Sequence, residues 1–538
     1  MKNNFFVCLF VLIAGLFSYG QNSKEILCKV LDIETKVPVS FATIKFERIQ
    51  NGVIADEDGE FRLPQDYKVS NKNIVISSIG FETLKVSVIT LKDSIVNIIY
   101  LKPKVEALSA VLVTGNSKLG ENSKGLTAKT IVKNAIGRIL TNYPNSAHSY
   151  ISYYRDYQLI KNNYYNLNEA ILESFDAGFD TDKYSNRQNV TALYSYNLNR
   201  EFYQDSLLLN SIYGKSKSIS EGDFAKLGTE IQNELEILNI HNPIRNFNKS
   251  SFSFIYIFRD NFVNNHLFKL SNITYVEDIP LYEIDFVTRD DPGMRYMGSG
   301  KIYVSKLNYA IHRIEYRVYA NRNYRSTRTQ GNTFANVMSK PKNILFEVKV
   351  EYKSKNNKMY LNYMTFNNLF VIKKPNPFKV DDFLFNPKTR NFILTFNTPL
   401  DMSTIERKSN FRLRYKDKKL IIKEIKAMDD KTVKIKVVDW SAGLNDDITT
   451  IDSMDFSYKL KRIKNTFGAT INQVNKISGY QFREYFTQEI FENKSPDEDL
   501  IYVDKTLPIS ATRTNKPSFD LGKYWVNSPL KKTKEANN

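Results

Sequence analysis

The few histidines and their acidic neighbours are the first residues in this chain that could do chemistry. The chain holds four histidines, and His312-Arg313-Ile314-Glu315 has the spacing of a His-x-x-Glu zinc-ligand pair. Residues three apart on a strand point to opposite faces, so both side chains could reach one ion only if the strand were bent. No third histidine lies in a matching context. The sequence therefore predicts no metal site at this pair.

The other three histidines, His148, His241 and His266, lie in Asn-rich or aromatic surroundings. We interpret them as surface residues whose hydrogen bonds are satisfied. A serine hydrolase would need a Gly-x-Ser-x-Gly elbow with a histidine partner, and the sequence contains no such elbow. No catalytic histidine is therefore expected.

A short glycine-rich run, Gly298-Ser299-Gly300-Lys301, resembles part of a phosphate-binding loop. Arg295 stands where the first glycine of that motif belongs, and Ile302 stands where a Ser or Thr would meet magnesium. We interpret the run as a turn into a strand. No nucleotide and no other cofactor is expected.

The acidic turn Asp56-Glu57-Asp58-Gly59-Glu60 begins like a calcium loop, but the distal Glu that completes an EF-hand is missing. Asp side chains in such turns accept hydrogen bonds from turn amides, and Gly59 can take a positive φ. The turn is therefore predicted to be structural.

Paired carboxylates can cleave a glycosidic bond without any short motif. Two carboxyl groups roughly 5–10 Å apart in one cleft would support an envelope hydrolase that processes glycans or peptides. The candidates in the strand-rich region are Glu169, Glu173, Asp285 and Asp290.

Two further features could form a binding surface. The loop Asp291–Met297 carries two Met, a Tyr and an Arg between predicted strands, and loops on a rigid sheet often carry binding residues. The aromatic strands at 150–172 and 252–258 could form the floor of a groove, although we expect their side chains to lie in the core.

Residues 1–20 indicate export. Lys2 precedes an apolar run from Phe5 to Phe17, and Ser18-Tyr19-Gly20 fits a signal-peptide cleavage site before Gln21. No later segment is long and apolar enough for a transmembrane helix, so none is expected after cleavage. The net charge of +18 is dispersed along the chain, which argues against nucleic acid and leaves envelope glycans or lipids as partners.

The region 25–103 reads as a small β-domain of short strands and turns. Its pieces include Val37–Phe46, the acidic turn with Gly59, Ile74–Leu84 with its Gly80 bend, and Ile95–Leu101. In this order they resemble the carboxypeptidase-D regulatory-like domain, a seven-stranded prealbumin-type sandwich that is an accessory module in envelope proteins of Bacteroidetes-type bacteria. The resemblance implies the fold and the compartment, and it implies no activity.

The remaining chain divides into a linker at 104–126, a central α+β domain at 127–375, a second sandwich at 376–473 and an extension at 474–538. The central domain should begin with a helix capped by Thr127 and continue as a large antiparallel sheet. It resembles an uncharacterised domain that follows the regulatory-like module in such envelope proteins. Asn391–Asp401 and the strands after it resemble a bacterial Ig-like domain, with Asp401 capping a short turn.

The sequence thus predicts a mainly β, multi-domain protein of the periplasm or outer membrane. Its expected role is non-enzymatic binding or scaffolding through the central sheet, with its domains strung as rods. Two alternatives stay open: a hydrolase that uses the carboxylates above, and an accessory subunit of an outer-membrane transport system. The oligomeric state and the identity of the partner, whether an outer-membrane protein, a glycan or a lipid, are not determined.

Overall fold

The computed structural model describes residues 25–47, 52–70, 72–93, 95–107, 126–183, 185–206, 208, 233–248, 258, 260–321, 323–324, 344–375, 378–386, 389–416, 418–438 and 455–530. The chain forms two compact units. One, called the body here, comprises residues 1–370 and 479–538, and the other, called the inserted unit, comprises residues 371–478. The signal peptide and most of the predicted linker lie outside the described residues.

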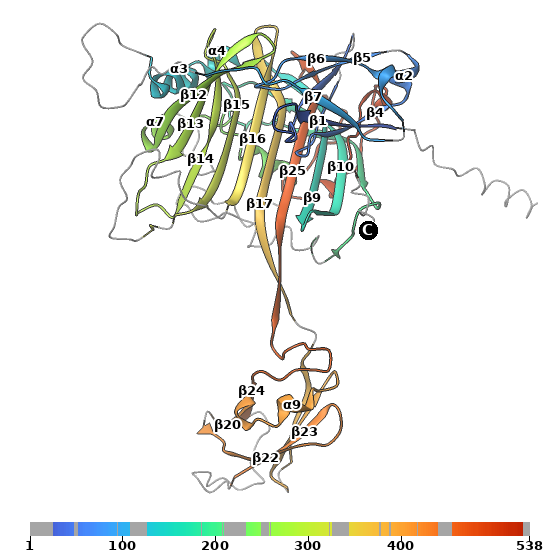
Figure 1. The fold of residues 1–538 in the computed structure, drawn as a ribbon, viewed down its shortest axis with the longest axis vertical. Helices are drawn as coiled ribbons and strands as arrows, with labels where there is room; N and C mark the ends of the chain where they lie inside the picture. Colours follow the sequence, from blue (N-terminus) through green and yellow to red (C-terminus); the bar gives the residue numbers. More distant parts are fainter. Residues whose placement is uncertain are drawn as a thin grey trace, which may run out of the picture. The chain divides into compact units, whose positions relative to one another are not determined.

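The body begins with a seven-stranded sandwich, as the sequence predicts (Figure 1). One sheet has three strands, in the order β4 (Glu60–Pro64), β1 (Glu25–Asp32) and β7 (Asn97–Leu101). The other has four, in the order β3 (Gly52–Ile54), β2 (Thr43–Phe46), β5 (Asn73–Ser77) and β6 (Leu84–Ser87). A short helix, α2 (Asp66–Val69), follows β4. Cys28 is buried in the core of this sandwich, where burial raises the pKa of its thiol to about 12.

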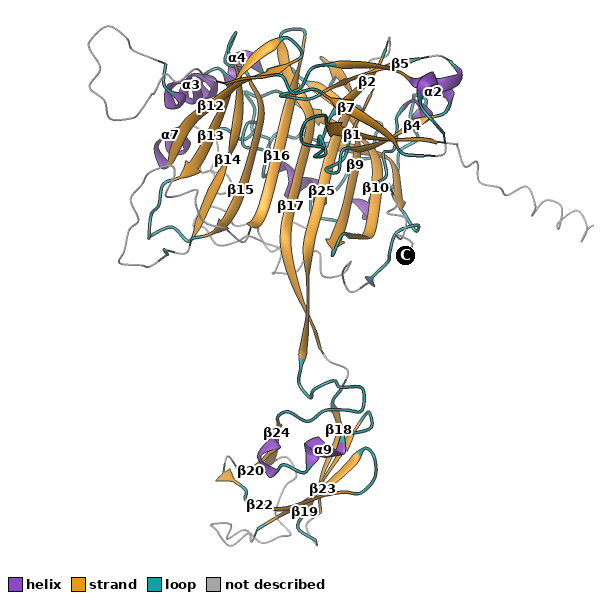
Figure 2. Cartoon of the chain, in the orientation of Figure 1, coloured by secondary structure: helices purple, strands orange, loops and turns teal. Residues whose placement is uncertain are grey.

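An 11-stranded sheet forms the rest of the body's framework (Figure 2). Strands such as β16 alternate buried and half-buried residues, whereas β9 and β10 are buried on both faces along most of their length. From one edge to the other the strands are β11 (Thr191–Leu198), β10 (Asn163–Asp176), β9 (His148–Ile160), β25 (Val474–Glu492), β17 (Lys358–Pro375), β16 (Ile344–Lys355), β15 (Ile311–Ala320), β14 (Tyr296–Ser305), β13 (Ile279–Thr288), β12 (His266–Val276) and β8 (Val105–Ala107).

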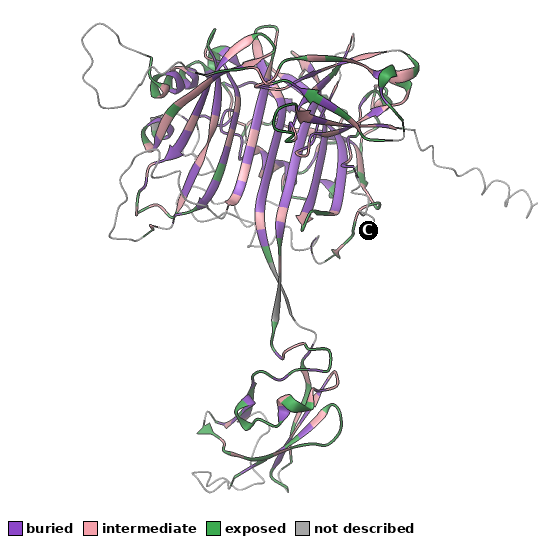
Figure 3. Cartoon of the chain, in the orientation of Figure 1, coloured by how far each residue is buried: buried purple, intermediate pink, exposed green. Residues whose placement is uncertain are grey.

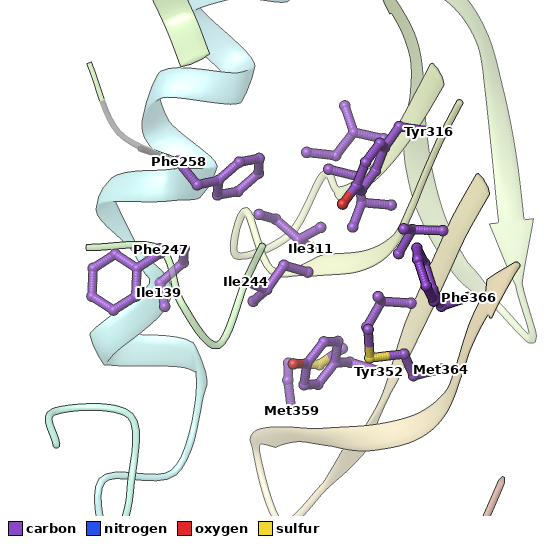
Figure 4. Packing of buried hydrophobic residues seen from close by; sticks show 14 of the residues in the cluster. Ile139, Ile244, Phe247, Phe258, Ile311, Tyr316, Tyr352, Met359, Met364 and Phe366 are labelled. Atoms are coloured by element: carbon purple, nitrogen blue, oxygen red, sulfur yellow. The ribbon is translucent and has the colours of Figure 1, made fainter. Parts of the chain in front are cut away.

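One face of this sheet packs against helices. α3 (Ala128–Gly137) begins at the predicted cap, where the Thr127 side chain accepts a hydrogen bond from the Thr130 amide at 3.2 Å. α4 (Ile139–Asn142), α6 (Glu234–Asn239) and α7 (Asp260–Asn265) complete the helical layer. Figure 4 shows Ile139 and Phe258 on this side meeting side chains of the sheet. The aromatic side chains of β9 are buried, as expected for core, and residues 252–257 lie outside the described part of the chain.

The tail of the chain completes the sheet. The sequence predicts that the central domain ends at residue 375 and that 474–538 is an extension. In the structure β25 lies in the middle of the large sheet, paired antiparallel with β9 from Tyr480↔Leu159 to Glu492↔His148. The segment 376–473 is thus inserted between two strands of one sheet. The difference arises because an alternating pattern predicts a strand but does not identify its partner.

The inserted unit is itself a two-sheet sandwich around one apolar core. One sheet has the order β18 (Val380–Asn386), β19 (Asn391–Phe396), β23 (Thr432–Val437) and β22 (Ile422–Ala427). The other has the order β21 (Lys418–Lys419), β20 (Phe411–Tyr415) and β24 (Phe456–Leu460). Asp401 caps α9 (Met402–Ile405) by accepting a hydrogen bond from the Ser403 amide at 3.1 Å, which confirms the predicted cap.

Candidate functional site

The N-terminal sandwich is docked on the second face of the large sheet, and Phe41 is central to the contact. Its ring stacks on Tyr363 of β17, with centroids 5.1 Å apart, and lies near Phe486 of β25 at 6.4 Å. Phe41 adopts a left-handed backbone conformation with φ of 58°, which is rare for a bulky residue. Within the sandwich the Phe41 amide donates a hydrogen bond to the main-chain oxygen of Asp56 at 3.1 Å, so the sandwich presents this ring to the sheet. The prediction of domains strung as rods does not hold for this pair.

A buried ion pair lies in the same interface. Arg155 of β9 and Glu484 of β25 are 1% and 0% exposed, and Arg155 Nε donates to Glu484 Oε2 at 2.5 Å. Arg155 also donates to the main-chain oxygen of Asn527 in the C-terminal segment at 2.9 Å. Burial opposes the charge on Arg155, but Glu484 and other acidic neighbours raise the pKa of Arg155 well above its ordinary value. Sheet, tail and ion pair therefore form one buried assembly; Figure 3 shows the central strands largely buried.

The acidic turn of the sandwich has the structural role that the sequence predicts. Asp56 Oδ1 accepts hydrogen bonds from the amides of Asp58 at 3.0 Å and Glu60 at 2.8 Å, and Gly59 has φ of 73°. Asp56 is 2% exposed. Burial raises its pKa to about 7, although nearby Arg155 acts in the opposite direction.

This raised pKa gives a pH-dependent prediction. The Asp56 carboxyl binds its proton more tightly in the folded state, where its pKa is about 7, than in the unfolded state, where it is about 4. Its contribution to the free energy of unfolding therefore falls as pH rises between these two values. Asp56→Asn keeps the Oδ1 acceptor and removes the titration. We therefore expect the free energy of unfolding of the variant, relative to wild type, to increase from pH 4.5 to pH 8, by at most about 1.4 kcal/mol per pH unit.

Tryptophan fluorescence in urea can measure this difference. The chain has two tryptophans. Trp525 packs against the core of the sandwich, and its main-chain amide donates a hydrogen bond to Gln488 Oε1 of β25 at 2.8 Å. With Trp440→Phe as the common background, the remaining signal reports on the body. Parallel pH profiles for wild type and Asp56→Asn would contradict the prediction.

Beyond the docked sandwich, the same face of the sheet carries alternating charges. Across four strands Asp285 lies opposite Lys301, Lys301 opposite Glu315, and Glu315 opposite Lys349. We call the full set the charge ladder; it comprises Glu283, Asp285, Lys301, Arg313, Glu315, Arg317, Glu347, Lys349 and Glu351. Opposite charges directly across a strand pair stabilise a sheet. The ladder therefore largely neutralises itself.

The ion pairs of the charge ladder confirm this arrangement. Arg317 Nε lies 2.9 Å from Glu347 Oε1, and Arg313 Nη1 lies 3.6 Å from Glu351 Oε2. Burial alone would raise the pKa of Glu315, but the cations around it, Arg313 foremost, hold that pKa below its ordinary value. The ladder keeps this carboxylate charged.

A cleft of about 200 Å³ opens where the sandwich meets the charge ladder. We call it the junction cleft. Lys349 Nζ lies 5.0 Å from the centre of the Phe41 ring and 3.4 Å from Glu57 Oε1 of the sandwich. A small cleft with both charges and an aromatic wall can hold one polar group of a larger ligand. The sandwich contributes Pro38, Val39, Ser40, Phe41, Ser78, Ile79 and Phe81, and the sheet contributes Arg313, Glu315, Lys349 and Tyr363.

The predicted carboxylates Glu169 and Glu173 do not form a catalytic pair. They are four residues apart on β10, which separates them by roughly 13 Å along the strand. Glu169 accepts hydrogen bonds from Tyr153 Oη at 2.5 Å and Ser528 Oγ at 2.6 Å. Glu173 pairs with Lys494 Nζ at 2.7 Å. Both groups hold the sheet and the tail together.

The other two candidates lie elsewhere. Asp285 is on β13, separated from β10 by six strands, where it accepts a hydrogen bond from Ser271 and lies 3.9 Å from Lys301 Nζ. Asp290 follows the end of β13 and accepts a hydrogen bond from Asn323 Nδ2 at 2.7 Å. The structure therefore does not bring the four carboxylates into one cleft.

The prediction that three histidines are surface residues is wrong. His148, His241 and His266 are at most 1% exposed. His241 stacks on Phe366 at 4.0 Å, and burial lowers its pKa to about 3. Aromatic neighbours surround these rings because they are in the core, where a neutral imidazole packs as a flat ring. The residues on either side of these histidines would look the same in the sequence of an exposed aromatic loop, so the sequence does not show that the rings are buried.

The two motif-like runs are also structural. His312 lines a different cavity from Glu315, so the pair does not face one ion position. Gly298–Lys301 lies within β14, so the interpretation as a turn is wrong; a Cβ on Gly300 would come 1.9 Å from the main-chain oxygen of Glu315. Gly300 therefore permits close strand approach. Over the described ranges, no three His, Cys, Asp or Glu side chains gather as metal ligands.

The loop Asp291–Met297 folds against its own sheet. Asn321 Nδ2 donates to the main-chain oxygens of Asp291 at 2.9 Å and Met294 at 2.8 Å. Met297 is buried beside Val287. The loop is therefore held by the sheet that carries it, as the alternative of a loop folded onto its own sheet predicts, while Asp291, Gly293 and Arg295 stay exposed.

Sequence reasoning did not identify the junction cleft. The available signal was the presence of charges at every second residue, at Arg313 and Glu315 on β15 and at Glu347, Lys349 and Glu351 on β16. Residues two apart on a strand share a face, so each strand shows one charged face. The sequence does not show that the sandwich covers part of that face.

Comparison with known proteins agrees with the first part of this fold. None of the helices that the structure describes has the length and apolar character needed to cross a membrane. No curated protein matches the chain. Residues 28–113 match the family model of the CarboxypepD_reg-like domain, so the N-terminal sandwich of this chain is a domain of that kind.

Proposed function

We propose that this protein is exported to the cell envelope and acts there by binding or scaffolding, without catalysing a reaction. The observation that carries the proposal is the docking of the regulatory-like sandwich onto the large sheet, with the junction cleft at their boundary. The buried contacts make sandwich, sheet and tail one rigid support. The junction cleft then offers a fixed pattern of charges to a partner.

The carboxylates support the same proposal. Each candidate acid group already accepts a hydrogen bond or forms an ion pair within the body. A general acid needs a position facing the substrate, whereas these groups connect neighbouring strands and segments. Export rests on the composition of residues 1–20, which lie outside the described part of the chain.

The test is co-purification from the native host. The full chain with a C-terminal tag would be expressed, the envelope fractionated, and partners identified in mild detergent. Ser78→Trp fills the junction cleft, and Ser70→Trp places the same side chain on the sandwich outside it. We expect one envelope partner to be retained by wild type and Ser70→Trp and to be lost from Ser78→Trp.

Two results would overturn the proposal. Equal recovery of the partner with both tryptophan variants would remove the junction cleft from the binding surface. Hydrolysis of a peptide or glycan by the purified protein, abolished by Glu169→Gln or Asp285→Asn, would replace binding with catalysis.

A further inference from the structure

A second cleft lies beside the junction cleft, between the same docked sandwich and the large sheet. Its volume is about 80 Å³, which is enough for a few water molecules or for one small group of a ligand. We call it the bulge cleft. The sandwich wall comes from β2 and the end of β5, and the sheet wall comes from the turn between β12 and β13 and from strands β15 to β17. The two clefts adjoin at Ser78 and Ile79.

Two β-bulges bring side chains to this cleft. On β15 the pairing with β14 skips His312, and on β17 the pairing with β16 skips Asn362. A bulge redirects the side chain of its extra residue, and bulges are frequent beside functional sites. Both extra residues line the bulge cleft. Two separate irregularities of the sheet therefore meet at one small space.

The two bulge residues have unused hydrogen-bonding capacity. Asn362 is 2% exposed, and its Nδ2 donates to Thr43 Oγ1 at 3.0 Å and to Glu351 Oε1 at 2.9 Å. Its Oδ1 accepts no hydrogen bond from the described part of the chain, and a buried acceptor without a donor is unfavourable. Burial lowers the pKa of His312 to about 4, so its ring is neutral at pH 7 and can donate one hydrogen bond and accept another.

Lys353 supplies a cation to the cleft. It forms no ion pair with any residue that the structure describes. The two carboxylates of the cleft are engaged elsewhere, because Glu277 lies 3.0 Å from Lys45 Nζ and Glu351 belongs to the charge ladder. Burial foremost, and neighbouring lysines after it, lower the pKa of Lys353 to about 8. Residues 48–51, which follow β2 in the chain, contain no Asp or Glu. These surroundings favour an anionic ligand group.

We propose that the bulge cleft binds the C-terminal residue of a peptide. Lys353 Nζ holds the terminal carboxylate, and Asn362 Oδ1 accepts a hydrogen bond from the amide N–H of the same residue. The neutral ring of His312 donates to the second carboxylate oxygen. A small aliphatic side chain then packs on the apolar wall of the cleft, which consists of Ile79, Val276 and Ile279.

The size of the cleft favours a peptide end over an acidic sugar. A uronic acid within a polysaccharide also carries a carboxylate beside hydrogen-bond donors, but its chain continues on two sides of the ring and needs an open groove. A peptide end enters with one residue, because its chain leaves on one side only. The inference goes beyond the proposed function, since it concerns a different cleft and a defined ligand.

The test is a saturation-transfer NMR titration of the full chain at pH 7 with N-acetyl-L-alanine. This compound carries the carboxylate, the amide N–H and a methyl side chain. Two matched compounds each lack one group: N-acetyl-L-alaninamide lacks the carboxylate, and N-acetyl-N-methyl-L-alanine lacks the N–H. We expect each of them to bind about tenfold more weakly or worse, because each loses one hydrogen bond to a buried or charged group.

Because the two clefts adjoin, the protein variants change residues that line only one of them. Lys353→Met removes the cation of the bulge cleft, and Lys349→Met removes the same charge from the same strand in the junction cleft. We expect the affinity for N-acetyl-L-alanine to fall about tenfold or more in Lys353→Met and by less than about twofold in Lys349→Met. Lys353→Met should unfold at the same temperature as wild type or higher, since burial disfavours the charge that it removes.

Three results would overturn the inference: no binding of N-acetyl-L-alanine by wild type, equal weakening in both lysine variants, or tighter binding of D-glucuronate than of N-acetyl-L-alanine. If N-acetyl-L-alanine does not bind while Ser78→Trp still loses the envelope partner, only this inference falls and the proposed function stands.

Discussion

Replacing Arg155 with methionine is expected to lower the free energy of unfolding of the body by about 3–5 kcal/mol. The substitution leaves Glu484, which is 0% exposed, without its cation in the middle of the sheet. It also removes the hydrogen bond from Arg155 to the tail at Asn527. An uncompensated buried carboxylate is among the most destabilising changes that a core can contain.

Two further variants make this result specific. Arg155→Met combined with Glu484→Met removes both charges, and we expect it to recover much of the loss because no buried charge of this pair remains. Lys85→Met breaks an exposed pair with Glu47 and should cost less than about 1 kcal/mol. Urea unfolding followed by Trp525 fluorescence in the Trp440→Phe background measures all three. If Arg155→Met lowered the free energy of unfolding no more than Lys85→Met does, the pair would contribute nothing to stability.

Phe41→Ala is expected to destabilise the docking of the sandwich by about 3–5 kcal/mol. The truncation removes the ring that stacks on Tyr363 and Phe486, and it leaves a void at the edge of the junction cleft. Alanine keeps a Cβ in the left-handed conformation at φ 58°, so the backbone strain of the native residue stays.

Comparison with glycine separates the strain from the contact. Glycine adopts a positive φ without a steric penalty, so Phe41→Gly should be more stable than Phe41→Ala by about 1 kcal/mol, contrary to the usual order of the two residues. Phe467→Ala is the control, because Phe467 is 80% exposed and its truncation should change the free energy of unfolding little. The measurement is the same urea unfolding with Trp525 as the probe. A higher free energy of unfolding for Phe41→Ala than for Phe41→Gly would contradict the inference that the backbone at position 41 is strained.

The local elements of this fold follow from the sequence. The aromatic residues of 150–172 predict strands, and β9 and β10 cover this range, with the register Asn163↔Ile160 on either side of their turn. Thr127 and Asp401 cap helices as expected, because a cap depends on residues within one turn. The structural role of the acidic turn at Asp56 is also predictable, because its hydrogen bonds join residues at most four positions apart.

Contacts between distant segments do not follow from the sequence. The sequence predicts only an extension at 474–538, because the partner of β25, the strand β9, is more than 300 residues earlier and no local signal selects it. The ring of the left-handed Phe41 packs against Tyr363 and Phe486, which lie more than 300 residues later in the chain. Glu169 and Glu173 could be found as acidic groups on an aromatic strand. Their engagement by Ser528 and Lys494 depends on where the tail lies.

The position of β25 has a consequence for the order in which the chain can fold. Strands β9 to β11 and β12 to β17 belong to one sheet only through β25, which is synthesised after the inserted unit. Until residues 474–492 arrive, β9 and β17 each present an unpaired edge, and such edges attract other chains. Sheet closure over so long a sequence separation is slow. The nascent protein is therefore expected to need protection from aggregation until β25 has been made.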